Sequence, residues 1–301
     1  GTNALYANTT GTDNTAVGHN ALDANTTGTL NTAVGKDALG SNTTASSNTA
    51  VGREAMRDNT TGTNNISMGV SALSTNTTAS SNTALGTAAL RRNTTGPSNT
   101  AVGHQAMDSN TTGFENVASG YRALYNNTSG ETNTAIGTEA LRDNQTADNN
   151  TAVGKSALMS NTTGELNTAV GRGALDASTT AEYNVAVGKD AGSTLTTGSY
   201  NAVLGTFALR DSTTAARSVA IGTSALQNNV SGGDNTAVGS NCLTSTTGNN
   251  NTAIGYASGN ANTSGSQNTF VGRDSGKNVT TGTNNTVLGD NTSASSATVS
   301  N

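Results

Sequence analysis

The sequence is poor in most of the residues that build an ordinary globular core. Hydrophobic residues make up 32% of the 301 residues, aromatic residues 3% and charged residues 11%, and tryptophan is absent. A typical soluble domain has roughly 45–50% apolar residues when glycine is counted with them. A thick-cored enzyme fold is therefore disfavoured. A disordered chain is disfavoured too, because such chains usually carry high net charge or much proline, and this one has a net charge of −5 and one proline.

Other residues and segments that the sequence lacks exclude further classes of protein. Cys242 is the only cysteine, so the chain has no intrachain disulfide. No stretch approaches the roughly 20 apolar residues of a membrane span, so we expect no membrane insertion. The acidic net charge argues against a nucleic-acid partner, and we expect no cofactor. The chain begins at Gly1 without an initiator methionine, and we expect it to be a piece of a longer protein.

What the sequence has instead is a repeat of 17 residues. The consensus unit is N-T-A-V-G-x-x-A-L-x-x-N-T-T-G-x-x, as in residues 14–30, and only the step from Gly239 to Gly255 is 16. The repeat glycines that we single out are Gly18, Gly35, Gly52, Gly86, Gly103, Gly137, Gly154 and Gly171. A unit of 17 residues cannot bury its own apolar face, but stacked units can. The repeat therefore predicts an all-β parallel β-solenoid, or β-roll.

Each unit predicts one short strand and a thin core. Alternate residues of a strand face opposite sides, so we expect Val17 and Val34 to point into the coil together with Leu22 and Leu39. The Ala16 column would then face outward, where its small side chains would let a neighbouring chain come close. This arrangement predicts self-association through the alanine face.

The two corners of the unit also have predicted roles. The repeat glycine should lie where φ is positive or where a neighbouring backbone leaves no room for a Cβ atom. The second corner begins with Asn25 and Thr26, and we expect these side chains to form ladders along stacked coils. The same N-T-T motif matches the acceptor pattern for N-glycosylation, which is the alternative. Residues 53–57 and 138–142 have helix-forming composition, so we expect one short helical or 3₁₀ turn per coil.

The repeat fixes the expected domain organisation. We assign residues 1–289 to the solenoid and residues 290–301 to a divergent C-terminal segment. From about residue 190 the repeat is less regular, because Gly192, Gly259 and Gly276 replace the leucine. We expect a thinner or differently closed core there.

No catalytic, cofactor-binding or metal-binding residue is predicted. His19 and His104 are five repeats apart, roughly 24 Å at the spacing of stacked strands, so they cannot share a metal ion. The residue after the glycine is often basic and the next often acidic, as in Lys36 and Asp37. We interpret these charges as a solvated edge, with a glycan- or receptor-binding stripe as the alternative. Cys242 stands in an alanine column and should be a small buried thiol.

The strand motif resembles known repeats. The sequences NTAVG at residue 14, NTAIG at residue 133 and SVAIG at residue 218 resemble the head repeats of YadA-type trimeric adhesins, and NTFVG at residue 268 is similar to repeats of phage tail fibres. The resemblance covers nearly the whole chain, although the adhesin-head repeat is shorter than 17 residues. It implies a homotrimer, an attachment role without catalytic residues, and an extracellular location on a cell surface or a virion.

We therefore expect a structural or attachment fibre, the shaft or stalk of a surface adhesin or phage tail fibre, and not an enzyme. Its partners would be further copies of itself and a cell-surface glycan or receptor. The first alternative is an ice-binding solenoid that uses Thr and Asn ladders, although the adjacent Thr26 and Thr27 lack the T-x-T order that pairs outward threonines. The second is a tailspike that binds or degrades polysaccharide, which would need clustered acidic residues.

Overall fold

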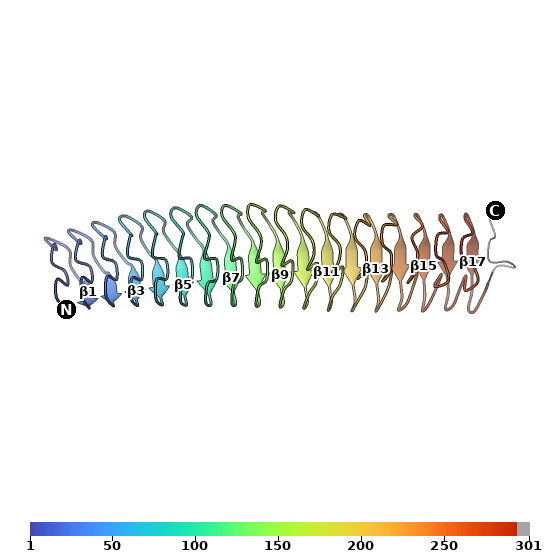
Figure 1. Ribbon diagram of the computed structural model, residues 1–301, viewed down its shortest axis with the longest axis horizontal. Helices are drawn as coiled ribbons and strands as arrows, with labels where there is room; N and C mark the ends of the chain where they lie inside the picture. Colours follow the sequence, from blue (N-terminus) through green and yellow to red (C-terminus); the bar gives the residue numbers. More distant parts are fainter. Residues whose placement is uncertain (294–301) are drawn as a thin grey trace. The chain divides into compact units, whose positions relative to one another are not determined.

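The computed structural model describes residues 1–293, and the chain divides into two compact units, unit 1 (residues 1–149) and unit 2 (residues 150–301). Each unit is a parallel β-solenoid in which every coil contributes one strand of three residues (Figure 1). No helix occurs in the described residues. The predicted all-β solenoid of 17-residue coils is confirmed.

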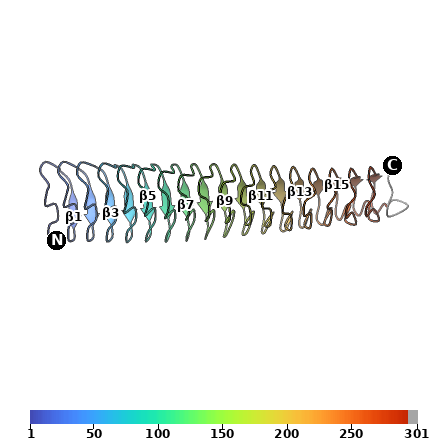
Figure 2. The same cartoon turned by 45° about the horizontal axis from the view of Figure 1, so that its top comes forward.

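Consecutive strands within each unit lie side by side (Figure 2). They pair in parallel and in register, so that Thr15 lies beside Thr32 and Thr151 beside Thr168. Unit 1 contains β1 (Thr15–Val17), β2 (Thr32–Val34), β3 (Thr49–Val51), β4 (Ile66–Met68), β5 (Thr83–Leu85), β6 (Thr100–Val102), β7 (Val117–Ser119) and β8 (Thr134–Ile136). Unit 2 contains β9 (Thr151–Val153), β10 (Thr168–Val170), β11 (Val185–Val187), β12 (Ala202–Leu204), β13 (Val219–Ile221), β14 (Thr236–Val238), β15 (Thr252–Ile254), β16 (Thr269–Val271) and β17 (Thr286–Leu288). β17 ends just before the predicted boundary at residues 289 and 290, and residues 294–301 of the predicted C-terminal segment lie outside the described residues.

The strand residues face the opposite way from our prediction. Ala33 is completely buried, whereas Val17 is 56% exposed and Val34 is partly exposed. The reason is the thinness of the coil. Leu22 and Leu39 fill the interior from the turn that follows each strand, so only a small side chain fits beneath the strand itself.

The last coils show that the alanine and leucine columns meet inside the coil. Phe270 stands in the alanine column and is fully buried, and the leucine column carries Gly259 and Gly276 around it. A Cβ atom added to Gly259 would lie 2.6 Å from Cδ2 of Phe270. Beside Gly192 the interior is refilled by Leu195, which replaces the corner asparagine and is also fully buried. The less regular part of the repeat is thus closed differently, by side chains from other columns.

The turn segment after each strand is not helical, so the predicted helical or 3₁₀ turn is wrong. Within residues 53–57, Glu54 and Met56 have φ of 57° and 52° and alternate with residues of negative φ. The alternation turns the N–H groups of these two residues toward opposite neighbours: that of Glu54 donates to the carbonyl oxygen of Lys36 in the preceding coil (2.8 Å), and that of Met56 to that of Ala72 in the following coil (2.9 Å). A helix would keep these hydrogen bonds within the segment. Bonding between coils therefore overrides helix propensity.

The repeat glycines form the first corner of each coil. The eight glycines singled out above have φ between 133° and 142°. A Cβ atom on Gly18 would overlap the carbonyl oxygen of Gly35 in the next coil. Positive φ and close backbone approach therefore both require glycine here.

Buried asparagines occupy the second corner. Nδ2 of Asn25 donates to Oδ1 of Asn8 (2.8 Å) and to the carbonyl oxygen of Gly28 (3.1 Å). The hydroxyl of Thr26 donates to the carbonyl oxygen of Thr43 in the next coil (3.0 Å). The Asn25 side chain is fully buried, and its Oδ1 accepts a hydrogen bond from Nδ2 of Asn42 (2.9 Å), so these asparagines form the expected ladder along the stacked coils.

A second asparagine ladder, which the sequence analysis did not single out, precedes the strands, with Ser218 replacing the asparagine before β13. The backbone N–H of Asn31 donates to Oδ1 of Asn14 (3.0 Å), and Nδ2 of Asn31 donates to the carbonyl oxygen of Ala45 (2.8 Å). Asn31 is fully buried. The first residue of the N-T-A-V-G motif is therefore asparagine because its amide connects one coil to the next.

Candidate functional site

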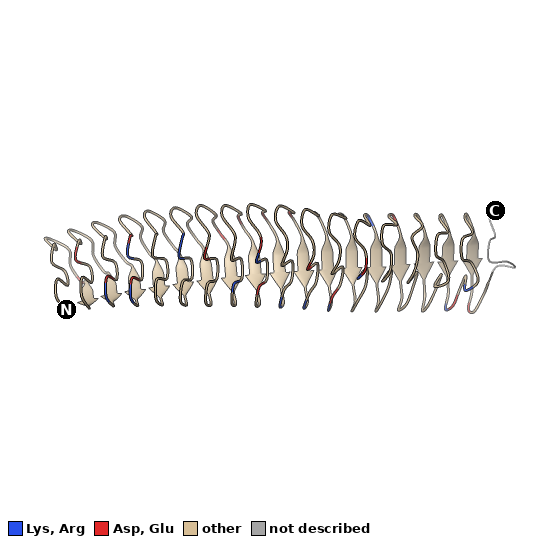
Figure 3. Ribbon diagram, viewed as in Figure 1, with Lys and Arg blue, Asp and Glu red and all other residues tan. Residues whose placement is uncertain are grey.

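No pocket occurs in the described residues, so the candidate sites are surfaces. The most regular is the outward side of the strands, which we call the strand face. Each coil presents there the first and third residues of its strand, as Thr100 and Val102 in β6. Figure 3 shows that the strands carry no Lys, Arg, Asp or Glu within the part of the chain that the structure describes. The strand face is therefore a surface of methyl groups and hydroxyls.

Large apolar side chains lie exposed along the strand face of both units. In unit 1 they are Val17, Ile66, Met68, Val102, Val117 and Ile136, and in unit 2 they are Val185, Leu204, Ile221, Ile254 and Leu288. Exposure reaches 50% for Leu204 and 64% for Leu288. Because the strands pair in register, these side chains form columns with the strand spacing of about 4.8 Å.

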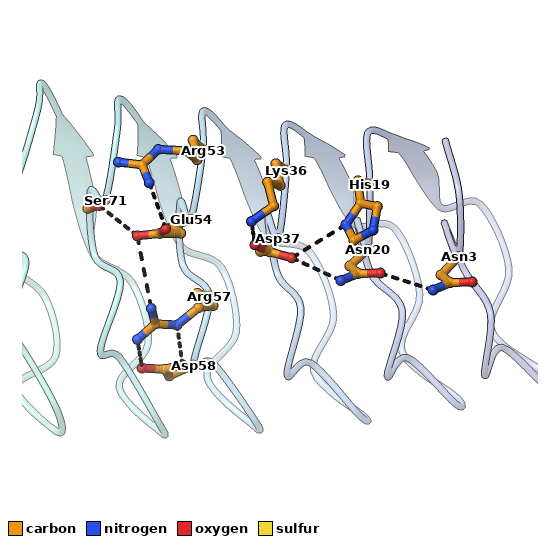
Figure 4. Close-up of polar contacts among 10 residues, drawn as sticks. All are labelled: Asn3, His19, Asn20, Lys36, Asp37, Arg53, Glu54, Arg57, Asp58 and Ser71. Carbon is orange, nitrogen blue, oxygen red and sulfur yellow. Dashed lines mark hydrogen bonds and ion pairs between the residues drawn. The ribbon is translucent and has the colours of Figure 1, made fainter.

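The turn segment after the first corner carries many of the charges (Figure 4). Nζ of Lys36 lies 2.9 Å from Oδ2 of Asp37, and Nη1 of Arg53 lies 2.9 Å from Oε1 of Glu54. Hydrogen bonds from Lys36 and then Asn20 lower the pKa of Asp37 against the opposing effect of burial. Exposed pairs of this kind stabilise a fold by about 0–1 kcal/mol each. They keep one surface of each coil polar.

The two histidines have different neighbours. Nδ1 of His19 is 4.0 Å from Oδ1 of Asp37, whereas the ring of His104 lies against that of Tyr121, with 5.7 Å between the centroids. Among residues 1–293, no group of three or more His, Cys, Asp or Glu side chains could hold a metal ion.

Cys242 is completely buried in the alanine column. Its thiol donates to the carbonyl oxygen of Ala253 (3.2 Å), and burial raises its pKa to about 12. The thiol is protonated at neutral pH and is therefore a poor nucleophile. The predicted small buried thiol is confirmed.

Sequence reasoning missed the aromatic clusters on the surface. In unit 2 the rings of Tyr183 and Tyr200 stack with centroids 4.9 Å apart. The ring of Phe207 lies 5.0 Å from Nζ of Lys189 and 5.2 Å from Cζ of Arg210. The signal in the sequence was an aromatic residue in a column that is polar or charged in most other coils.

A further cluster lies in unit 1, in the turn segment after β7. Cζ of Arg122 lies 5.2 Å from the centroid of the Tyr121 ring and 5.1 Å from that of Tyr125. Such distances are typical of cation–π contacts. The sequence signal here is an arginine in a column that carries Asp37, Glu54 and equivalent acids in other coils.

The predicted structural residues divide between interior and surface. Leu22, Leu39 and Asn25 are fully buried, whereas Val17 and Val34 lie on the strand face.

The described residues contain no helix that is long and apolar enough to span a membrane. Comparison of the chain with protein-family models, curated proteins and solved structures found no match.

Proposed function

We propose that this chain is a segment of a structural and attachment fibre that assembles as a homotrimer through its strand face. The observation that carries this proposal is the in-register column of exposed valine, isoleucine and leucine on that face in both units. Monomeric soluble proteins rarely expose large contiguous apolar patches. Every coil presents a similar pair of side chains, so the face matches the same face of another copy.

Two arguments favour three copies. Each strand presents only two outward side chains, so the face is narrow, and three narrow faces can converge around a three-fold axis. The resemblance of the strand motif to YadA-type heads supports the same number. It also supports a place outside the cell or on a virion, and a glycan or receptor as the second partner.

We also propose that the chain is not an enzyme. Many of its carboxylates are held by basic neighbours, as Asp108 is by Arg91 (2.8 Å) and Asp211 by Arg210 (2.7 Å). The hydrogen bond from Arg210 lowers the pKa of Asp211. A carboxylate stabilised in its charged form is a poor general acid at neutral pH. These pairs support a structural role for the acidic residues.

Light scattering after size-exclusion chromatography tests the trimer. We expect a mass about three times the 29.8 kDa of one chain. Replacing three exposed strand-face residues together, Met68→Glu, Val102→Glu and Ile136→Glu, should give monomers with an unchanged circular dichroism spectrum, because these side chains are not part of the core.

The matched control places the same charges on the second corner, where Thr27, Thr61 and Thr95 are exposed and lie away from the strand face. The triple Thr→Glu variant should remain trimeric. A wild-type chain that is monomeric at every concentration, or a strand-face variant that stays trimeric, would overturn the proposal.

Ice binding is a second candidate, favoured by the outward threonines of the strands. The strand-face threonines form short columns beside the apolar column, as Thr83 and Thr100 do before Val117 interrupts the column. A monomer would leave this regular array exposed. Thermal hysteresis shown by a monomeric wild type and lost in Thr100→Lys would support this function. A trimer without hysteresis would reject it.

A further inference from the structure

The coil that begins at Tyr121 departs from a charge pattern that two other coils of unit 1 share. Arg122 stands in a column where other coils carry Asp37, Glu54, Glu139 and Asp190. Tyr125 stands where Arg57, Arg142 and Arg210 occur, and Asn126 stands where the partner acids Asp58, Asp143 and Asp211 occur. Two other coils carry the complete set of acid, arginine and acid at these positions, whereas this coil carries arginine, tyrosine and asparagine.

This replacement leaves the Arg122 guanidinium without a carboxylate. In other coils an arginine donates hydrogen bonds from Nε and Nη2 to the two carboxylate oxygens of the following aspartate, at 2.6–2.9 Å. These arginines are Arg57, Arg142 and Arg210. No ion pair in residues 1–293 includes Arg122. The nearby Glu139 is within 3.7 Å of Nη1 of Arg142.

The guanidinium is nevertheless held in place. Nε of Arg122 donates to Oε1 of Gln105 in the preceding coil (3.0 Å), and the rings of Tyr121 and Tyr125 both contact the cation. The two terminal nitrogens, Nη1 and Nη2, are not used by these contacts, and together they can bind both oxygens of a carboxylate end-on. A preorganised arginine loses less conformational entropy when it binds a ligand.

The surroundings supply what a sugar ring requires. Tyr121 is 41% exposed, and the exposed His104 lies against it. Aromatic rings offer apolar area with a polar tip, so they can contact the C–H groups of a sugar while their hydroxyls bond to its hydroxyl groups. We call Tyr121, Arg122 and Tyr125, with His104 and Gln105, the Arg122 cluster.

We propose that the Arg122 cluster binds a carboxylate-bearing saccharide, such as a chain of hexuronic acid residues. The guanidinium receives the carboxylate and the tyrosines contact the sugar ring. The inference rests on the attachment role proposed above and names its ligand class. In a trimer the site would occur three times, and binding to a polymer would gain in avidity.

The other aromatic clusters do not offer the same chemistry. At Phe207, both cations already have acidic partners: Lys189 lies 3.8 Å from Asp190 and Arg210 lies 2.7 Å from Asp211. Tyr183 and Tyr200 stack on one another and therefore cover a face of each ring. Arg122 differs in combining an unneutralised charge with adjacent aromatic surface.

Calorimetric titration of the full chain with oligogalacturonate, and with a sialylated oligosaccharide as a second probe, tests the proposal. We expect binding of at least one of them, and weakening by about tenfold or more in Arg122→Gln. Arg122→Lys keeps the charge but loses the fork, and should also bind more weakly than wild type. Tyr125→Ala should weaken binding without removing charge.

The matched control is Arg92→Gln. Arg92 is exposed, and its guanidinium donates to the hydroxyl of Ser109 (3.4 Å) and contacts no aromatic ring among the described residues. Its replacement should leave the affinity unchanged. No binding of either acidic probe, equal binding of neutral maltotetraose or of polyglutamate, or equal loss in both arginine variants would overturn the proposal. Light scattering on the same samples measures the mass of the assembly, so the proposed trimer and the proposed saccharide binding are tested separately.

Discussion

Leu22 and its equivalents hold a backbone conformation that leucine rarely adopts. Leu22, Leu39 and Leu73 have φ of 50°, 50° and 51° and are fully buried. Left-handed conformations cost about 1–2 kcal/mol for an L-residue. The conformation persists because the N–H of Leu22 donates to Ala38 in the next coil (3.0 Å) while the side chain fills the core. Each residue is thus stabilised by neighbouring coils against its own preference.

A glycine substitution measures how closely the coils approach. Gly103 has φ of 135°, and a Cβ atom there would lie 2.5 Å from the carbonyl oxygen of Gly120. Gly103→Ala should therefore destabilise the protein by about 2 kcal/mol or more in chemical denaturation. Gly40 is the control, because a Cβ atom there would meet nothing nearer than 3.5 Å. Gly40→Ala should change the free energy of unfolding by less than about 1 kcal/mol, and equal effects would contradict the predicted close approach.

A coil, the structural element of this fold, contacts the coils directly before and after it within its unit. Damage to one coil should therefore remain local. Leu73→Asp would bury a carboxylate without a partner and should cost several kcal/mol. Hydrogen exchange should rise across about three coils around Leu73, and a uniform loss of protection would contradict the model.

The control for Leu73 is a leucine of similar conformation on the surface. Leu30 has φ of 58° and is 60% exposed. Leu30→Asp should change stability by no more than about 0.5 kcal/mol. A comparable loss in both variants would show that backbone conformation, and not burial of the charge, determines the effect.

Phe270 and Gly276 test the match between facing columns. Phe270→Ala removes a fully buried ring and should cost about 3–5 kcal/mol. Gly276→Leu alone should also destabilise, because a Cβ atom there would overlap the Phe270 ring. The double variant restores the alanine and leucine pair of ordinary coils. In a double-mutant cycle, we expect the double variant to lose less free energy of unfolding than the two single variants lose together. Strictly additive losses would show that the two columns do not contact each other inside the coil.

The repeat made the element predictable, but not the direction of its side chains. The coil length, the glycine corner and the Asn25 ladder follow from the period and from the chemistry of glycine and asparagine. The inward face of the strand depends on how much space Leu22 leaves, which is a tertiary property. The sequence contained one indication of it, because Phe270 in the alanine column coincides with Gly276 in the leucine column. The Arg122 cluster could be found only by comparing every coil with its column.

At the scale of the whole molecule, the strand face links stability to association. If three chains bury this face against one another, association stabilises the folded state. The midpoint of thermal unfolding should therefore rise with protein concentration. The Met68→Glu, Val102→Glu and Ile136→Glu variant should lose this dependence. Calorimetry at several concentrations measures both, and a wild-type midpoint independent of concentration would contradict the trimer.

The alternation of N–H directions in the turn segments has a mechanical consequence. The backbone hydrogen bonds of Glu54 and Met56 run to neighbouring coils, and the main bond that joins the two ends of one coil is that of the asparagine before the strand, as from Nδ2 of Asn31 to Ala45. A pulling force on the chain ends should therefore peel a unit one coil at a time. Each event would release 17 residues, or roughly 60 Å of extended chain, so a force–extension trace should show a regular sawtooth with that period. Under tension such a molecule would lengthen in small steps and dissipate energy at each one.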